Sequence, residues 1–191
     1  MNIKIHTIFS AFAMTVLAAS ANATLITINM TADNAIIDGG LCSDASCIGG
    51  TQWPVFGGTM NNWRQSSTAV VDLGPGTYSF AWSIQNYGTA STNNPAALLA
   101  EILWDDIAHY SSSTWEVFDG VSGNLIETAT EYGKNGANNI WTRVNGGAVD
   151  GISTDANWIF TDNFADADAE NVWIRTKIQI AAVPEPGSIA L

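Results

Sequence analysis

The run from Thr77 to Asn86 alternates apolar and polar side chains with a period of two, which is the pattern of a half-buried β-strand. Its apolar face carries Tyr78, Phe80, Trp82 and Ile84. Shorter runs that we expect to form strands, with Gly, Asn or Pro between them, occur at residues 25–31, 69–73, 98–104, 115–118, 140–144, 158–161 and 172–180. No helical pattern of useful length follows residue 23. Short strands at regular spacing predict an all-β sandwich or barrel.

Two connections between these runs are long. Residues 33–58 are rich in Gly, Asp and Ser and are expected to form a loop. Residues 162–171 join the last two strands, which we expect to pair with each other as a hairpin. Most hairpins need only about 2–5 residues in the turn, so this second connection is longer than its predicted role requires.

The first 23 residues have the features of a secretory signal peptide. Lys4 precedes an apolar stretch from Ile8 to Ala19, and Ala21-Asn22-Ala23 is a small-x-small cleavage site. The stretch is too short for a membrane span, which needs about 20 apolar residues. The mature chain is therefore expected to begin at Thr24, with one β-sandwich domain over residues 24–182.

The charge and the cysteines fit export. The chain has 6 Lys and Arg against 18 Asp and Glu, a net charge of -12. Such a charge argues against nucleic acid as a partner, because that affinity comes largely from basic side chains. The two cysteines, Cys42 and Cys47, cannot build a zinc site without further Cys or His ligands, and outside the cell they are expected to form a local disulfide.

The C-terminal residues 183–191 carry a second targeting signal. Val183-Pro184-Glu185-Pro186, followed by Gly187 and Ser188, resembles the PEP-CTERM signal of exosortase-sorted bacterial proteins. In that family an apolar helix and a basic cluster follow the motif, and here only Ile189, Ala190 and Leu191 remain, as if the tail were truncated. The resemblance implies export and sorting machinery as partners, a cell-surface or matrix location, and transient membrane anchoring if the full tail exists.

The domain itself resembles galactose-binding-like jelly-roll modules. The similarity lies in Thr31-Ala32-Asp33-Asn34, Asn62-Trp63, residues 73–78, residues 94–102 and the two last strand patterns. It implies a jelly-roll-like β-sandwich, a fold that also serves as an accessory domain of glycosidases. The Gly-rich, Cys-bearing segment 36–50 departs from the pattern of these modules.

Two loop tryptophans and one acidic loop are the candidate binding residues. Trp82, Trp104, Trp115 and Trp158 lie in strand patterns and are expected in the core, whereas Trp53 and Trp63 lie in polar loops, where an indole contacts a sugar or packs under the loop. The acidic loop is a candidate calcium site or a simply solvated loop. Its carboxylates are Asp162, Asp166, Asp168 and Glu170.

Catalysis has weak support in the sequence. Glu101, Asp105 and Asp106 could supply paired carboxylates for glycoside cleavage, but no nucleophile elbow, zinc-binding helix motif or phosphate loop is present. His109 is expected in a loop. We therefore expect a non-enzymatic surface or matrix protein without a required cofactor, with an exopolysaccharide as candidate ligand. The alternatives are a secreted glycoside hydrolase or other hydrolase, an ice-binding protein, for which flat Thr arrays are missing, and a purely structural coat protein.

Overall fold

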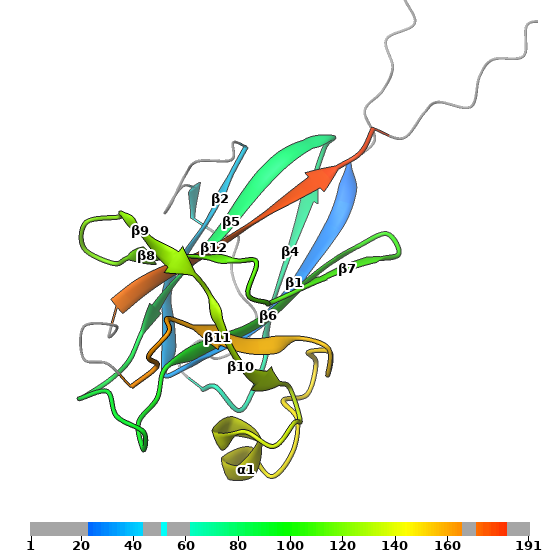
Figure 1. The fold of residues 1–191 in the computed structure, drawn as a ribbon. Helices are drawn as coiled ribbons and strands as arrows, with labels where there is room; N and C mark the ends of the chain where they lie inside the picture. The colour runs from blue at the N-terminus through cyan, green and yellow to red at the C-terminus, as the bar shows by residue number, and fades with distance from the viewer. Residues whose placement is uncertain (1–22, 44–50, 53–61, 166–170, 183–191) are drawn as a thin grey trace, which may run out of the picture.

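Two antiparallel β-sheets form the body of the protein, which the computed structural model describes over residues 23–43, 51–52, 62–165 and 171–182 (Figure 1). Sheet A contains β1 (Thr24–Asp33), β4 (Ser67–Leu73), β6 (Ala97–Trp104), β7 (Ile107–Tyr110), β10 (Thr130–Lys134) and β11 (Asn157–Phe160). Sheet B contains β2 (Ala35–Cys42), β3 (Thr51–Gln52), β5 (Gly76–Gln85), β8 (Glu116–Asp119), β9 (Leu125–Thr128) and β12 (Asn171–Ile180).

The strand order is β10–β11–β6–β1–β4 in sheet A, where β7 also pairs with β6, and β3–β2–β5–β12–β8–β9 in sheet B. This arrangement confirms the predicted all-β sandwich. Long strands lie at the centre of each sheet, and short ones such as β3, β9 and β10 lie at the edges.

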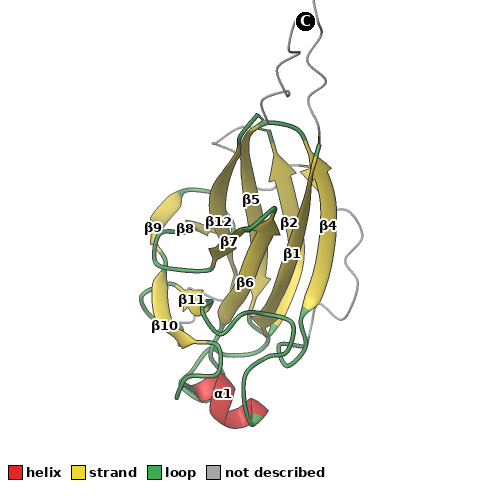
Figure 2. Cartoon of the chain, turned by 90° about the vertical axis from the view of Figure 1, so that its right-hand side faces the viewer, coloured by secondary structure: helices red, strands yellow, loops and turns green. Residues whose placement is uncertain are grey.

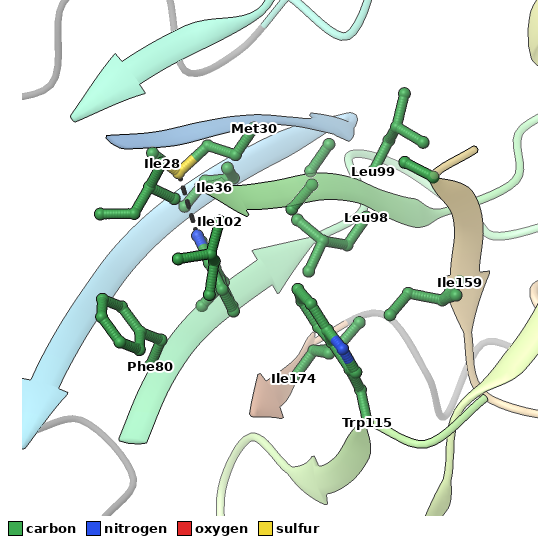
Figure 3. Close-up of a cluster of buried hydrophobic side chains, with 14 of the residues drawn as sticks. Ile28, Met30, Ile36, Phe80, Leu98, Leu99, Ile102, Trp115, Ile159 and Ile174 are labelled. Atoms are coloured by element: carbon green, nitrogen blue, oxygen red, sulfur yellow. Dashed lines mark hydrogen bonds between the residues drawn. The ribbon is translucent and has the colours of Figure 1, made fainter. Parts of the chain in front are cut away.

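The core lies between the two sheets. Figure 3 shows Ile28, Leu98 and Ile102 of sheet A opposite Phe80 and Ile174 of sheet B. The four tryptophans predicted from strand patterns are buried, which confirms their assignment to the core. In the described chain the inner and outer faces of β5 are both covered, because Ser79, Ala81 and Ser83 are buried as well.

Four sequence predictions about individual elements are wrong. Residues 33–58 are not one loop, because Asp33 ends β1 and residues 35–42 form β2, which pairs with β5. The two glycines of β2, Gly39 and Gly40, gave this strand the composition of a loop. His109 is also not a loop residue, since it lies in β7 and pairs with Ile102.

The segment predicted as a strand at residues 140–144 is a helix, α1 (Ile140–Asn145). Asn139 caps its first turn, accepting a hydrogen bond from the Thr142 backbone N–H at 2.8 Å. Gly146 follows the helix in the left-handed conformation, with φ of 81°. These two local signals, at either side of a β-branched run, override the strand propensity.

The last two strands do not form the predicted hairpin. β11 pairs with β10 and β6 in sheet A, whereas β12 lies between β5 and β8 in sheet B. The connection between β11 and β12 therefore passes from one sheet to the other.

The strands run between two opposite ends of the sandwich. Thr24 pairs with Leu73 and Ile180 with Gly76, so the first and last described strands begin and finish at one end. Asp33, the last residue of β1, pairs with Ala97 at the other end. Helix α1 lies at this second end, below the strands in Figure 2.

Candidate functional site

A cleft of about 200 Å³ lies at the α1 end of the sandwich, where the chain leaves sheet A for sheet B. We call it the corner cleft. It collects residues from four parts of the chain: the β1–β2 corner, the segment before β4, the β5–β6 loop and α1. They are Asp33, Asn34, Trp63, Arg64, Asn93, Asn94, Pro95, Ile140, Trp141 and Val144.

Asp33 provides a buried carboxyl group to this cleft. It is only 5% exposed, and desolvation raises its pKa from 3.8 to about 6, although two hydrogen bonds act in the opposite direction. Trp141 Nε1 donates to Oδ2 at 2.9 Å, and Asn34 Nδ2 donates to Oδ1 at 2.7 Å. The group is therefore oriented by its neighbours and close to half ionised at mildly acidic pH.

Asparagines fix the β5–β6 loop at the rim of the cleft. Asn34 Oδ1 accepts the backbone N–H of Tyr87 at 2.6 Å. Asn94 Nδ2 donates to the backbone oxygens of Tyr87 and Thr89 at 3.0 and 3.1 Å. Asn93 is exposed, so its side-chain amide is placed for contact with a molecule in the cleft.

A group of five aromatic side chains supports the floor of the cleft. Trp141, 2% exposed, stacks on Trp158 with ring centroids 4.8 Å apart, and Trp63 meets Trp158 edge-on at 6.3 Å. Tyr132 and Phe164 extend the group, since both contact Trp141 and each other. Trp63 is the partly exposed member at the corner cleft, which leaves part of its indole in contact with solvent.

A second cleft, of about 320 Å³, adjoins the first across Ile140 and Trp141, which line both. We call it the helix cleft. The other residues that line it are Thr92, Tyr132, Asn138, Asn139, Arg143 and Phe164. The two clefts together place amides, hydroxyls, indole edges and two arginines along one end of the sandwich.

A third cleft lies beside β8 and β12, and its charged groups bind one another. Arg175 Nη2 and Lys177 Nζ lie 2.8 and 3.4 Å from Oε2 of Glu116. Burial alone would raise the pKa of Glu116, but the bonds and charges of Arg175 and Lys177 lower it below its ordinary value. His109, whose pKa burial lowers, bonds Thr176 Oγ1 at 2.7 Å and stacks on Trp115.

The structure separates the candidate residues of the sequence. Trp63 lines the corner cleft, whereas Trp53 lies outside the described residues. Cys42 is disulfide-bonded, and Cys47 lies outside the described residues, so the pairing of the two stays a prediction. The sorting residues Val183, Pro184, Glu185 and Pro186 lie outside them as well.

The predicted calcium loop is described only at its start. Asp162 is exposed, and its backbone N–H donates to Glu127 at 2.9 Å. Asp166, Asp168 and Glu170 lie outside the described residues. Within the part of the chain that is described, no group of three or more His, Cys, Asp or Glu side chains could hold a metal ion.

The carboxylates proposed for hydrolysis occupy different surroundings. Glu101 is 5% exposed, and its two oxygens accept hydrogen bonds from Asn29 Nδ2 at 2.8 Å and the Ser153 backbone at 2.9 Å. Asp105 and Asp106 form the exposed turn between β6 and β7. Glu101 therefore cross-links sheet A to the loop before β11.

Sequence reasoning missed most of the corner cleft. Asp33 and Asn34 belong to a motif that resembles jelly-roll modules, but their position at the crossing between sheets depends on β2, for which the sequence predicts a loop. Trp141 was assigned to a strand. The signals that the sequence does offer are Asn139 and Gly146, the two residues that cap α1.

No known family model, curated protein or solved structure matches this chain. Among the helices of the described residues, none has the length and apolar character to cross a membrane. The function must therefore be argued from the geometry of the clefts.

Proposed function

We propose that this chain is an exported, surface- or matrix-associated, non-catalytic glycan-binding protein of the galactose-binding-like jelly-roll type, and that the corner cleft holds the sugar. The single observation that supports it best is the arrangement of a partly exposed indole, Trp63, beside the carboxyl of Asp33 and the exposed amide of Asn93. Sugar rings offer C–H faces to an indole and hydroxyls to polar groups at its edge.

The rigidity of the site supports binding over a purely structural role. Asp33, Asn34 and Asn94 are held by hydrogen bonds to neighbouring side chains and backbone, so their order is established before a ligand arrives. Preorganisation of this kind lowers the entropic cost of association. The open shape and small volume suit one or two sugar units of a longer chain.

The test is titration calorimetry of the mature domain with oligosaccharides chosen from a glycan array. Trp63→Ala should weaken binding by about tenfold or more, since a stacked aromatic carries a large share of the contact energy. Trp173→Ala is the matched control, because Trp173 is also partly exposed but lies on β12, away from both clefts. Equal loss in the two variants, or no binding to any glycan, would leave a structural coat protein as the better hypothesis.

A hydrolase remains the alternative that the same experiment can address. The recovered oligosaccharide should be intact after prolonged incubation with the protein. Release of shorter products that stops in Asp33→Asn would replace binding with glycoside hydrolysis at this cleft.

The signal peptide and the C-terminal sorting motif are supported by the sequence alone and need a separate experiment. Expression with export should yield a chain whose N-terminus is Thr24 and whose mass shows two fewer hydrogens, as a Cys42–Cys47 bond requires. An exported protein that still contains residues 1–23, or that has two free thiols, would contradict this part of the proposal.

A further inference from the structure

Some of the basic side chains in the described part of this acidic protein form ion pairs with carboxylates, and others do not. Among the described residues, Lys134 pairs with Asp155, and Arg175 and Lys177 share Glu116. The described basic residues that remain are Arg64 and Arg143, and no described carboxylate lies within ion-pair distance of either one.

Both of these arginines lie at the two adjoining clefts. Arg64 lines the corner cleft, where its guanidinium carbon is 5.2 Å from the centre of the Trp63 ring. Arg143 is exposed on the last turn of α1 and lines the helix cleft. Ile140 and Trp141 line both clefts, so the two charges lie at clefts that share these two residues.

The stacking of Arg64 on Trp63 positions a cation beside the surface proposed for the sugar. A guanidinium over an indole is favourable by itself, and it still leaves N–H donors directed outward for a second partner. Arginine binds carboxylate and sulfate groups through paired hydrogen bonds, which a neutral hydroxyl group cannot match.

The charged side chains that line the two clefts have the opposite net sign to that of the whole chain. The described residues that line the two clefts include one acidic side chain, Asp33, against two arginines. Asp33 is buried and its oxygens already accept bonds from Trp141 and Asn34, so it faces the ligand less than the arginines do. A net charge of -12 would otherwise repel an anionic polymer.

We infer that the ligand is an anionic saccharide, one carrying carboxylate or sulfate groups, that lies across the corner and helix clefts with Arg64 and Arg143 bound to its acidic groups. This inference rests on the proposed glycan binding and names the class of glycan. A ligand that reaches both Arg64 in the corner cleft and Arg143 in the helix cleft extends over two clefts, which favours at least two sugar units.

The test uses oligosaccharides that differ in charge alone. Oligogalacturonides and their methyl esters share one backbone, a sulfated galactan oligosaccharide tests sulfate, and a neutral galactan oligosaccharide completes the set. Each is titrated calorimetrically into the wild-type domain, Arg64→Gln, Arg143→Gln and Trp63→Ala. Lys134→Gln is the control, because it changes the net charge equally but lies outside both clefts.

The expected result is tighter binding of the acidic or sulfated oligosaccharide than of its neutral counterpart, with affinity falling as salt rises. Arg64→Gln and Arg143→Gln should each weaken the charged ligand by about tenfold and leave the neutral one unchanged. Lys134→Gln should change neither.

Other outcomes distinguish a failure of the anionic-ligand inference from a failure of the glycan-binding proposal. Equal binding of both charged oligosaccharides and their neutral counterparts, or an equal loss in Lys134→Gln, would overturn the anionic ligand while the Trp63-dependent glycan site remains. Absence of binding to every charged and neutral saccharide would overturn the glycan-binding proposal itself.

Discussion

Asp33 is the side chain whose protonation most directly affects the corner cleft. Its carboxyl is buried between Trp141 and Asn34 at the point where β1 ends. Because burial raises its pKa to about 6, the folded state disfavours the ionised form relative to the unfolded chain. The contribution of this group to stability is therefore greatest below its unfolded pKa of about 4 and is lost as the pH rises through 6.

We predict that Asp33→Asn removes this pH dependence. The free energy of unfolding of the variant, relative to wild type, should increase by ~2–3 kcal/mol between pH 4 and pH 7, because the amide carries no charge to bury. Urea unfolding at several pH values measures the difference. The exposed Asp72→Asn should retain the wild-type profile, and a constant offset in Asp33→Asn across that range would contradict the assigned role.

The sequence predicts a functional residue where its type is unusual for its local setting, but not where its role depends on distant contacts. Trp63 could be proposed as a binding residue because an indole in a polar loop is unusual. Asp33 could not, since an acidic residue after a strand is common and its burial depends on Trp141, 108 positions away along the chain. Arg64 and Arg143 likewise acquire meaning only when the other cations are seen to be paired.

Helix α1 is the element that holds the two clefts in their relative positions. It carries Trp141 inward and presents Arg143 to solvent, and Asn139 begins it. The Asn139 side chain accepts from the Thr142 N–H and donates to the Lys134 oxygen at 2.9 Å, which ties the helix to β10.

We predict that Asn139→Ala lowers the free energy of unfolding by ~1–2 kcal/mol, the usual cost of removing a helix cap. Binding of the saccharide should weaken in parallel, because α1 lines both clefts. Asn138→Ala, at the exposed neighbouring position, should change stability little. Denaturant unfolding measures the stability of the wild type and both variants, and calorimetry measures their saccharide binding. Equal stability of the two variants would contradict the role of Asn139 as the helix cap.

The length of the connection between β11 and β12 is explained by the sheets that it joins. Its length suggested a metal loop because the two strands were expected to pair. In the structure they belong to different sheets, and a chain that crosses from one sheet to the other needs those residues as a connector. The geometric motive for calcium is thereby removed.

We accordingly expect the melting temperature of the mature domain to be the same with millimolar calcium as with chelator. Thermal unfolding followed by tryptophan fluorescence measures this. A rise with calcium that disappears in an Asp166→Ala, Asp168→Ala double variant would restore the acidic loop as a metal site.

For the whole molecule, the fold class was predictable and the topology was not. Alternation in residues 77–86 and 172–180 is a local property that any sheet containing those strands must satisfy. The pairing of β12 with β5 and β8 depends on contacts between residues roughly 50 to 100 positions apart, and the sequence pattern of one strand carries no information about its neighbour. Short edge strands such as β9 and β10 lack enough residues to show a period.

The two ends of the sandwich have different functions in the proposed scheme, and this can be tested. Protein attached to a surface through a tag placed after Ala182 should bind saccharide as strongly as protein in solution. Attachment through Val144→Cys on α1 should abolish binding, because Val144 lines the corner cleft. Surface plasmon resonance compares the two orientations, and equal binding in both would place the ligand elsewhere on the molecule.

The opposed ends also determine how the domain carries a mechanical load. In the proposed scheme, a chain anchored beyond Ile180 and bound to a polymer at the corner cleft is pulled along its strands, and β1 from Thr24 to Asp33 spans about 30 Å at the usual rise per residue. Hydrogen bonds of an antiparallel pair lie perpendicular to that direction. The ten-residue ladder between β12 and β5 is consequently loaded in shear, with all of its bonds resisting together instead of opening one after another.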